Sequence, residues 1–301
     1  EGMVSKLTII HLSGGFGNQL FSYAFGYAVA KARGDKLAID TAIQDAPWFF
    51  RNPDILEMKI TYDKRITYPI GRSLFQRGIW NKVCFRKAIG LFTKFLTEND
   101  LKNQEDPIAY CKSVKGNLYL KGNWGNESWF SSVKQDIPKK YQFMSPLSEE
   151  AQRIANEINS CENPVTVHIR RGDYVKIGIA LEKDYFQQAM EVIEKQISNP
   201  VFYCFSEDMQ WAKESFKGLP YQIKYVDYES PNKGIEDFRL LMEGKHQIIS
   251  NSSYSWWAAY LNPHTDKKVV IPCKEGSMWD HEFMVPGWIP LDFCVNGKQK
   301  G

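Results

Sequence analysis

The fold of this chain is decided by one stretch, Val165-Thr166-Val167-His168-Ile169-Arg170-Arg171-Gly172-Asp173-Tyr174. Pro164 precedes a run of β-branched and apolar residues, which predicts a buried strand entered after a turn. The strand leads directly into Arg170 and Arg171, whose planar guanidinium groups match phosphate oxygens. In an open α/β sheet, ligands bind beyond the carboxyl ends of the strands. The stretch therefore indicates a pyrophosphate site, with a solvated arginine loop as the alternative.

Regular alternation of strand and helix surrounds this stretch. The predicted strands are 165–170, 201–206, 221–226, 246–250 and 268–272, and the predicted helices are about 184–197, 208–217, 234–244 and 255–261. Continuous apolar strands separated by helices predict a parallel, doubly wound sheet that is covered on both faces. Ser148, followed by two acids, predicts the start of a helix that connects this domain with the preceding one.

A second strand, loop and helix lie at the N-terminus. Leu7–Leu12 is a β-like run, which leads through Gly14-Gly15-Phe16-Gly17-Asn18-Gln19 into an apolar helix. Glycines let the backbone approach a ligand closely, and a helix N-terminus offers N–H groups to an anion. The spacing matches neither a dinucleotide fingerprint nor a P-loop, so a plain tight turn is the alternative. We expect two domains, residues 1–150 and 151–301.

Two further predicted strands end in polar clusters. One ends in Phe205-Ser206-Glu207-Asp208, and the other ends in Ser250-Asn251-Ser252-Ser253-Tyr254, which opens a helix. An N-cap requires a single serine, whereas several hydroxyls at the positive end of a helix dipole suit phosphate oxygens. Three polar strand ends in one sheet, one of them with two arginines, favour a nucleotide diphosphate as the ligand.

Composition limits the classes of function. Among 301 residues 43% are hydrophobic, enough for one large domain or two ordinary ones, and the net charge of +3 argues against a nucleic-acid binder. The six cysteines form no Cys-x-x-Cys pair, so we expect reduced thiols in a cytoplasmic protein. No apolar run approaches the ~18 residues of a membrane span. Glu1 and Gly2 before Met3 are typical of a cloning remnant, which leaves the natural start open.

Residues 41–150 carry weaker patterns. Arg72–Leu96 is basic and partly amphipathic, which favours a solvated helical face, with a membrane-surface or lipid-linked-acceptor role as the alternative. Asn117–Leu120 predicts a strand. Trp124 lies in the loop after it, where an indole could stack on a sugar ring, although packing is the ordinary role of a tryptophan.

Together these motifs resemble glycosyltransferase family 11, the α-1,2-fucosyltransferases. The resemblance rests on four stretches in the family's order, Gly14–Phe21, His168–Tyr174, Phe205–Asp208 and Ser250–Trp257. It implies a GT-B architecture, in which two Rossmann-like domains face a cleft. The C-terminal domain would bind GDP-β-L-fucose, and the N-terminal domain would hold a galactose-terminated oligosaccharide whose 2-hydroxyl is fucosylated with inversion. The chain looks like the bacterial members, which implies a cytoplasmic enzyme and leaves open a peripheral contact with the inner face of the cell membrane.

The resemblance also implies roles for individual residues. Arg170 would meet the β-phosphate, Asp173 would order the arginine loop or touch the reacting centre, and Asn18 would reach fucose or acceptor. The other implied donor-binding residues are His168, Arg171, Ser206, Asp237, Asn251, Ser252, Ser253 and Tyr254. The implied acceptor-side or loop residues are Gly15, Phe16, Gly17, Gln19 and Trp124.

No Asp-x-Asp motif, through which many glycosyltransferases hold a divalent cation, occurs in the sequence. We therefore expect no cofactor and no metal, with GDP-fucose as co-substrate and Arg170 as the positive charge on the leaving group. The general base is left open between Asp173, Glu182, Asp184 and none. Alternatives to the fucosyltransferase are a transferase of another GDP-sugar or linkage, and a sugar-binding module without turnover.

Overall fold

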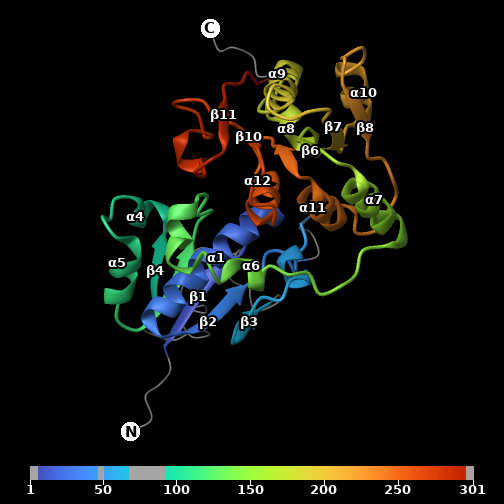
Figure 1. The fold of residues 1–301 in the computed structure, drawn as a ribbon. Helices are drawn as coiled ribbons and strands as arrows, with labels where there is room; N and C mark the ends of the chain where they lie inside the picture. The colour runs from blue at the N-terminus through green and yellow to red at the C-terminus, as the bar shows by residue number, and fades with distance from the viewer. Residues whose placement is uncertain (1–5, 47–50, 68–92, 296–301) are drawn as a thin grey trace. The chain divides into compact units, whose positions relative to one another are not determined.

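The chain divides into two compact units in this computed structural model, Glu1–Ser145 and Pro146–Gly301, which we call the N-terminal and the C-terminal unit (Figure 1). The structure describes residues 6–46, 51–67 and 93–295. The helix predicted to start at Ser148 belongs to the C-terminal unit. Its N-cap is Ser148, whose Oγ accepts a hydrogen bond from the Ala151 N–H at 3.3 Å.

The N-terminal unit is built on a parallel sheet with the strand order β3-β2-β1-β5-β4. Its elements are β1 (Leu7–His11), α1 (Phe16–Arg33), β2 (Lys36–Asp40), the 3-10 helix η1 (Asp54–Glu57), β3 (Lys64–Ile66), β4 (Thr93–Thr97), α4 (Glu98–Lys102), α5 (Pro107–Ser113), β5 (Asn117–Lys121), η2 (Glu127–Val133) and α6 (Ile137–Lys140). Helix α1 is apolar along most of its length because it packs against β1, β2, α5 and η2. Strand β1 lies at the centre of the sheet, between β2 and β5.

The C-terminal unit holds a second parallel sheet, with the order β11-β10-β9-β6-β7-β8. Its elements are α7 (Glu149–Ser160), β6 (Pro164–Ile169), α8 (Gly172–Lys176), α9 (Lys183–Glu194), β7 (Val201–Ser206), α10 (Met209–Ser215), β8 (Gln222–Tyr225), α11 (Lys233–Glu243), β9 (His246–Ile248), α12 (Ser253–Leu261), β10 (Val269–Pro272), η3 (His281–Phe283) and β11 (Ile289–Leu291).

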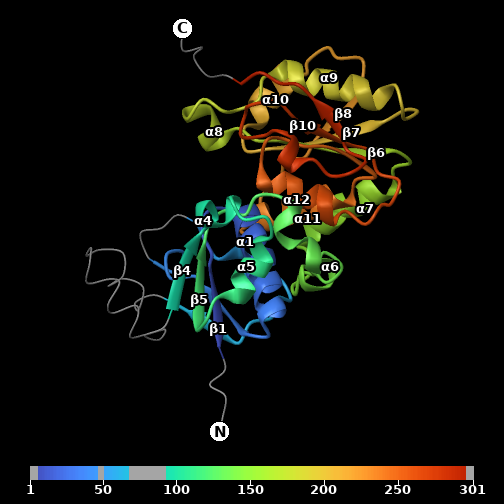
Figure 2. The same ribbon diagram turned by 90° about the vertical axis from the view of Figure 1, so that its left-hand side faces the viewer.

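Strand β6 lies in the middle of this sheet, and all its residues are buried. On one face of the sheet α7 and α12 both pack against α11, and α9 and α10 lie on the other face (Figure 2). The chain order reverses between β6 and β9, which is the kind of position where open α/β sheets bind ligands. The predicted doubly wound parallel sheet is therefore confirmed.

Some predicted elements differ from the observed ones. Helix α8 and strand β11 were not predicted, and the helix expected to reach about residue 197 ends at Glu194. Residues 72–92 of the basic stretch lie outside the described residues, while 93–96 belong to strand β4 rather than to a helical face. Five cysteines are free, and Cys84 lies outside the described residues. Within the described ranges, no helix has both the length and the apolar character needed to cross a membrane.

Candidate active site

The carboxyl ends of β6, β7 and β9 are joined by serine hydroxyl groups. The fully buried Ser250 Oγ donates to the His168 carbonyl at 2.7 Å and accepts from the Arg170 N–H at 3.0 Å. On the other side of β6, the Ser206 Oγ donates to the Ile169 carbonyl at 2.9 Å. The end of β6 is thus fixed from both neighbouring strands, which sets the direction in which the following arginine leaves the sheet.

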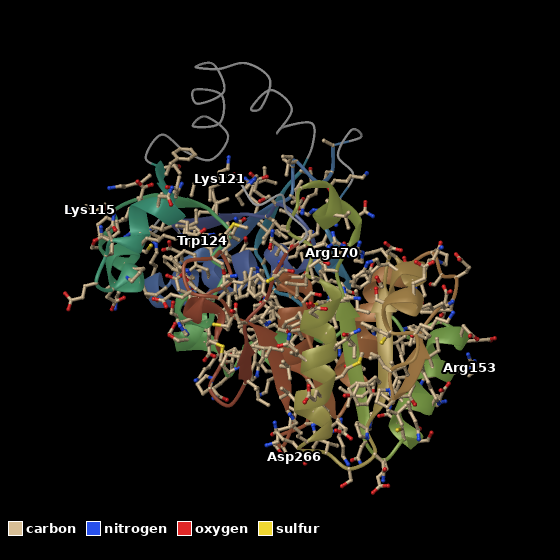
Figure 3. All side chains as sticks on the ribbon, turned by 90° about the horizontal axis from the view of Figure 1, so that it is seen from above. Lys115, Lys121, Trp124, Arg153, Arg170 and Asp266 are labelled. Atoms are coloured by element: carbon tan, nitrogen blue, oxygen red, sulfur yellow. The ribbon has the colours of Figure 1, made fainter. Side chains whose placement is uncertain are left out.

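Arg170 leaves β6 between two carboxylates. Its Nη1 pairs with Glu207, which follows β7, and its Nη2 lies 2.5 Å from Asp173 Oδ1 on α8. The guanidinium carbon also lies 5.0 Å from the centre of the Tyr174 ring. Figure 3 labels Arg170 beside the short helix α8. Glu207 holds the backbone as well, since its Oε2 accepts the Arg171 N–H at 3.2 Å. Glu207 is not among the donor-binding residues predicted from the sequence.

Arg171 points into the protein rather than toward solvent. Its Nε donates to Asp208 Oδ2 at 3.3 Å, and its guanidinium carbon lies 3.9 Å from the centre of the Trp211 ring. Only 8% of the residue is exposed. These contacts are those of a side chain that supports the arginine loop.

Two buried polar atoms at the same edge have no hydrogen-bond partner among the described residues. They are His168 Nδ1 on β6 and Asn251 Oδ1 after β9, whereas the Asn251 Nδ2 donates to the Ile179 carbonyl at 2.8 Å. Buried polar atoms are nearly always paired, so each of these two calls for a ligand or water. Burial, assisted by the charge of Arg170, lowers the pKa of His168 to about 3. The imidazole is therefore neutral at physiological pH.

Tyr254 brings the strand ends together with helix α11. Its ring lies 5.0 Å from the His168 ring and 5.3 Å from the Phe238 ring, between centres, and its hydroxyl donates to the Gly234 carbonyl. Asp237, one residue before Phe238, pairs with Lys233 at 3.2 Å, and burial raises the pKa of its carboxyl group. The structure thus gathers His168, Tyr254 and Asp237 in one region.

Two serines open helix α12. Ser252 is its N-cap and is buried, but no hydrogen bond from its side chain caps the helix. Ser253 is the first residue of the helix and is half-buried. The first turn therefore lacks the usual side-chain acceptor for its N–H groups.

The glycine loop of the N-terminal unit is held by buried amides. Gln19 is fully buried; its Nε2 donates to the carbonyls of Gly14 (3.2 Å) and Asn52 (2.8 Å), and its Oε1 accepts the Ile55 N–H at 3.1 Å. Gly14 has φ +73°, and a Cβ there would lie 2.8 Å from Asn18 Nδ2. Only glycine allows both this backbone and the approach of the Asn18 amide. Gln19 is therefore a residue that positions the loop.

The other predicted acceptor-side residues are more enclosed. Gly15 is the N-cap of α1, Phe16 and Gly17 are buried in its first turn, and the Phe16 ring lies 6.3 Å from that of Phe143. Trp124 is fully buried, with its ring 4.2 Å from that of Phe25, and lies among the side chains of its unit (Figure 3). This burial favours the packing role of Trp124 over stacking on a sugar.

The other two residues predicted as candidate general bases lie at the start of α9, where Glu182 is the N-cap and Asp184 stands in the first turn.

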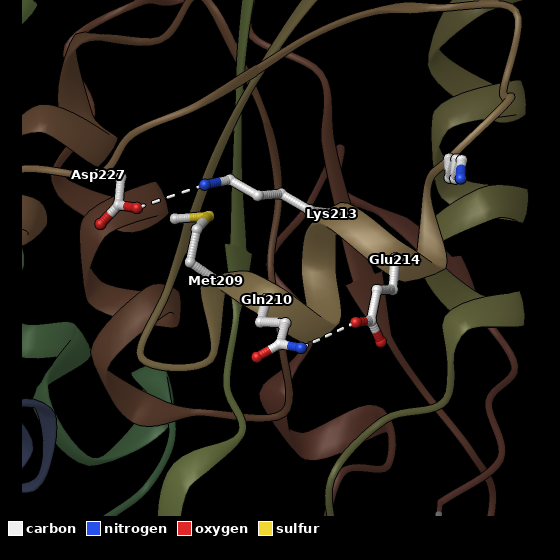
Figure 4. A pocket seen from close by; sticks show the side chains of 6 residues that line it. Met209, Gln210, Lys213, Glu214 and Asp227 are labelled. Carbon is white, nitrogen blue, oxygen red and sulfur yellow. Dashed lines mark hydrogen bonds and ion pairs between the residues drawn. The ribbon is translucent and has the colours of Figure 1, made fainter.

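A surface pocket near the carboxyl ends of β7 and β8 is lined by charged and polar side chains that pair with one another, Lys213 with Asp227 and Gln210 with Glu214 (Figure 4). The residues that the structure describes include no group of three or more His, Cys, Asp or Glu side chains placed to hold a metal.

Comparison with known proteins gives the family. The model of glycosyl transferase family 11 matches residues 111–292, more than half of the chain. The chain belongs to this family. It is 29% identical to an Escherichia coli alpha-1,2-colitosyltransferase over 264 residues (85% of this chain, 88% of the relative). It is 27% identical to rabbit (Oryctolagus cuniculus) galactoside alpha-(1,2)-fucosyltransferase 1 over 272 residues (85% and 64%). The family resemblance seen in the sequence is confirmed, and the chain is a glycosyltransferase.

Solved structures show the fold class. The fucosyltransferase NodZ from Bradyrhizobium matches with a TM-score of 0.54 at 14% identity, covering 86% of this chain and 94% of NodZ. A complex of a mutant Arabidopsis thaliana FUT1 with GDP matches with a TM-score of 0.52 at 9% identity (90% and 70%). With the two parallel sheets described above, these matches confirm the predicted GT-B class of two Rossmann-like units.

Proposed function

We propose that this family 11 enzyme is an inverting α-1,2-fucosyltransferase, which moves L-fucose from GDP-β-L-fucose to the 2-hydroxyl of a terminal β-galactoside. The main support for a donor site is a pair of buried atoms without a hydrogen-bond partner among the described residues, His168 Nδ1 and Asn251 Oδ1. They lie beside Arg170, where the chain order of the C-terminal sheet reverses between β6 and β9. The family and the names of the relatives support the reaction.

Arg170 is proposed to stabilise the leaving β-phosphate. Its two carboxylate partners are not equivalent, because Glu207 also holds the Arg171 N–H, whereas Asp173 lies on a short helix with 49% of its side chain exposed. We infer that the phosphate replaces Asp173 at Nη2, while Glu207 keeps the guanidinium in place. A guanidinium has N–H donors for both contacts at once. Arg171, Ser206 and Glu207 then keep the arginine loop in its binding geometry.

The nucleoside is proposed to lie on His168 and Tyr254, with Asp237 accepting N–H or O–H groups of guanine or ribose. A neutral His168 suits this role, because a cation there would repel Arg170. Asn251, Ser252 and Ser253 would place hydroxyl and amide groups on the diphosphate at the start of α12. In this proposal the C-terminal unit carries most of the donor contacts.

The loop Gly15–Gln19 of the N-terminal unit is proposed to serve the acceptor. Asn18 would hydrogen-bond fucose or the acceptor, and Gln19 would fix the loop. Leaving-group charge would rest on Arg170 and on the N–H groups of α12, so we propose that no metal is needed. Fixed donors in a site shielded from water can stabilise developing charge without reorganising.

The second candidate differs only in the donor sugar. Colitose is fucose without its 3-hydroxyl, and one Escherichia coli relative is named an alpha-1,2-colitosyltransferase. A GDP-colitose donor would use the same diphosphate and guanine contacts. The two candidate donors are therefore distinguished by comparing kcat/KM for GDP-fucose with kcat/KM for GDP-colitose, measured with the same acceptor.

The test has two parts. Thermal shift with GDP, UDP and free oligosaccharide, in the presence of EDTA, should show stabilisation by GDP above all. Acceptor-dependent release of GDP from GDP-fucose should then be observed with galactose-terminated oligosaccharides and should persist in EDTA. Complete loss of transfer in EDTA that Mn²⁺ restores would contradict the metal-free mechanism. If the protein binds GDP but transfers sugar from no GDP-sugar, the result would favour a sugar-binding module without turnover.

A further inference from the structure

Asp54 lies beside the glycine loop of the N-terminal unit. The fully buried Gln19 reaches from the Gly14 carbonyl to the Asn52 carbonyl and the Ile55 N–H, which lie on either side of Asp54 in the chain. These three hydrogen bonds fix the backbone of Asp54 against the first turn of α1. A carboxylate is thus held next to the loop that carries Asn18.

Arg51, three residues before Asp54, also lies close to the glycine loop. Its Nη1 is 3.6 Å from the position that a Cβ on Gly15 would take, and its charge acts on the Asp54 carboxylate. Asp54 itself forms no side-chain hydrogen bond or ion pair with any other residue that the structure describes. It is partly buried all the same. A carboxylate that is desolvated without serving the fold is a candidate for chemistry.

The position of Asp54 relative to the sheet agrees with such a role. Helix α1 starts after the carboxyl end of β1, which is the central strand of this sheet. Ligands of open α/β sheets bind at this edge. Resting on the proposed function, we propose that Asp54 is the general base that takes the proton from the acceptor hydroxyl. Asp54 would then be a catalytic residue on the acceptor side.

The proposed step transfers one proton to Asp54 and one fucosyl group to the acceptor. The Asp54 carboxylate accepts the proton of the galactose 2-hydroxyl, and an electron pair of that oxygen forms the new bond to C1 of fucose. The bond between C1 and the β-phosphate oxygen breaks, and its electron pair leaves with GDP. Asp54 then releases the proton to water. The products are the fucosylated glycan, GDP and one proton, and no oxidant or metal takes part.

The charges around Asp54 suit a base. Burial raises the pKa of Asp54 to about 6; Arg51 lowers it and Glu57 raises it. Helix α1, which packs against η1, adds no charge near Asp54, because its charged residues, Lys31 and Arg33, stand in its last turn. A base works best when its pKa lies just below the working pH.

Asp54→Asn tests the proposal against Glu57→Gln, a matched control in the same turn. Asp54→Asn should lower kcat about 10²-fold or more, which is the usual contribution of a general base, while GDP affinity stays unchanged. Its melting temperature should not fall, because burial disfavours the charged form that the amide replaces. Glu57→Gln should keep kcat and move the acid limb of kcat/KM downward. Formate should partly restore the activity of Asp54→Ala.

The pH profile separates a base from a structural residue. Wild-type kcat/KM should fall on the acid side of a pKa near 6, and Asp54→Asn should lack this limb. If the wild type transfers fucose and Asp54→Asn keeps its kcat, or keeps the acid limb, the role of Asp54 is wrong while the proposed function stands. If the wild type transfers no sugar from any GDP-sugar, the proposed function fails and the role of Asp54 with it.

Discussion

Arg170 is paired before any ligand binds, and the nature of its partners decides what the residue can do. Glu207 and Asp173 neutralise its charge, but they also fix the plane of its guanidinium. A fixed donor loses little entropy when a phosphate arrives. The sequence could predict an arginine at a strand end. It could not predict this pairing, because Glu207 follows a different strand and becomes a neighbour only through the pairing of β6 with β7.

The first prediction concerns this residue. Charge grows on the β-phosphate in the transition state, so Arg170→Ala should lower kcat by about 10²–10³, beyond any loss of donor binding. Arg170→Lys should remain impaired, because lysine keeps the charge but loses the fork. The matched control is Arg171→Ala, which should lower the melting temperature more than kcat, since Arg171 packs on Trp211. A folded Arg170→Ala with kcat near the wild-type value would refute the role.

The second prediction concerns Asn18. Its amide lies over Gly14, at the start of α1 and beside the backbone groups that Gln19 holds. Asn18→Ala should lower kcat more than it weakens GDP binding, because the proposal places Asn18 on fucose or acceptor. Steady-state kinetics and calorimetry with GDP measure the two effects separately. An unchanged kcat, or a loss confined to GDP affinity, would contradict this placement.

At the scale of the elements, the end of β6 depends on its neighbours. Ser250 joins β9 to β6 with one donated and one accepted hydrogen bond, and it is fully buried. Ser252, two residues later, caps α12 without a side-chain hydrogen bond. Two serines of one motif therefore serve different purposes, one of them the fold and the other, in our proposal, the ligand.

The third prediction follows from this difference. Ser250→Ala should lower the free energy of unfolding by about 1–3 kcal/mol, because the buried His168 carbonyl and the partly buried Arg170 N–H lose their partner. Ser252→Ala should leave stability nearly unchanged and weaken GDP binding. Urea unfolding and GDP titration of both variants check this. Equal stability losses in the two variants would mean that the contacts of Ser250 are not what distinguishes the pair.

The elements show how far sequence reasoning reaches. Strands such as Pro164–Ile169 and Val201–Ser206 were predictable because they are continuous apolar runs bounded by turns. Strand Ile289–Leu291 was not, because three residues with a central proline carry no periodicity. The donor side was visible as polar residues at strand ends. Gln19 was expected as a loop residue, but Asp54 was not, since its position arises from contacts of Gln19 with a segment that is distant in sequence.

For the whole molecule, two units of similar size each carry a parallel sheet, and they divide between Ser145 and Pro146. Our fourth prediction is that GDP contacts concentrate in the C-terminal unit. Hydrogen exchange with and without GDP should show protection at the ends of β6 and β9 and at the start of α12, because GDP would cover the backbone groups there. Protection mainly within residues 41–140 would contradict the prediction that GDP binds mainly to the C-terminal unit.

The proposed reaction is best tested by determining the structure of its product. GDP-fucose should be incubated with a β-galactoside that the acceptor screen identifies, and the purified product should be analysed by NMR. We expect an α-linked fucose on the 2-hydroxyl of the terminal galactose, formed with inversion from the β-linked donor. A β-linked product, or fucose on any other hydroxyl, would contradict it.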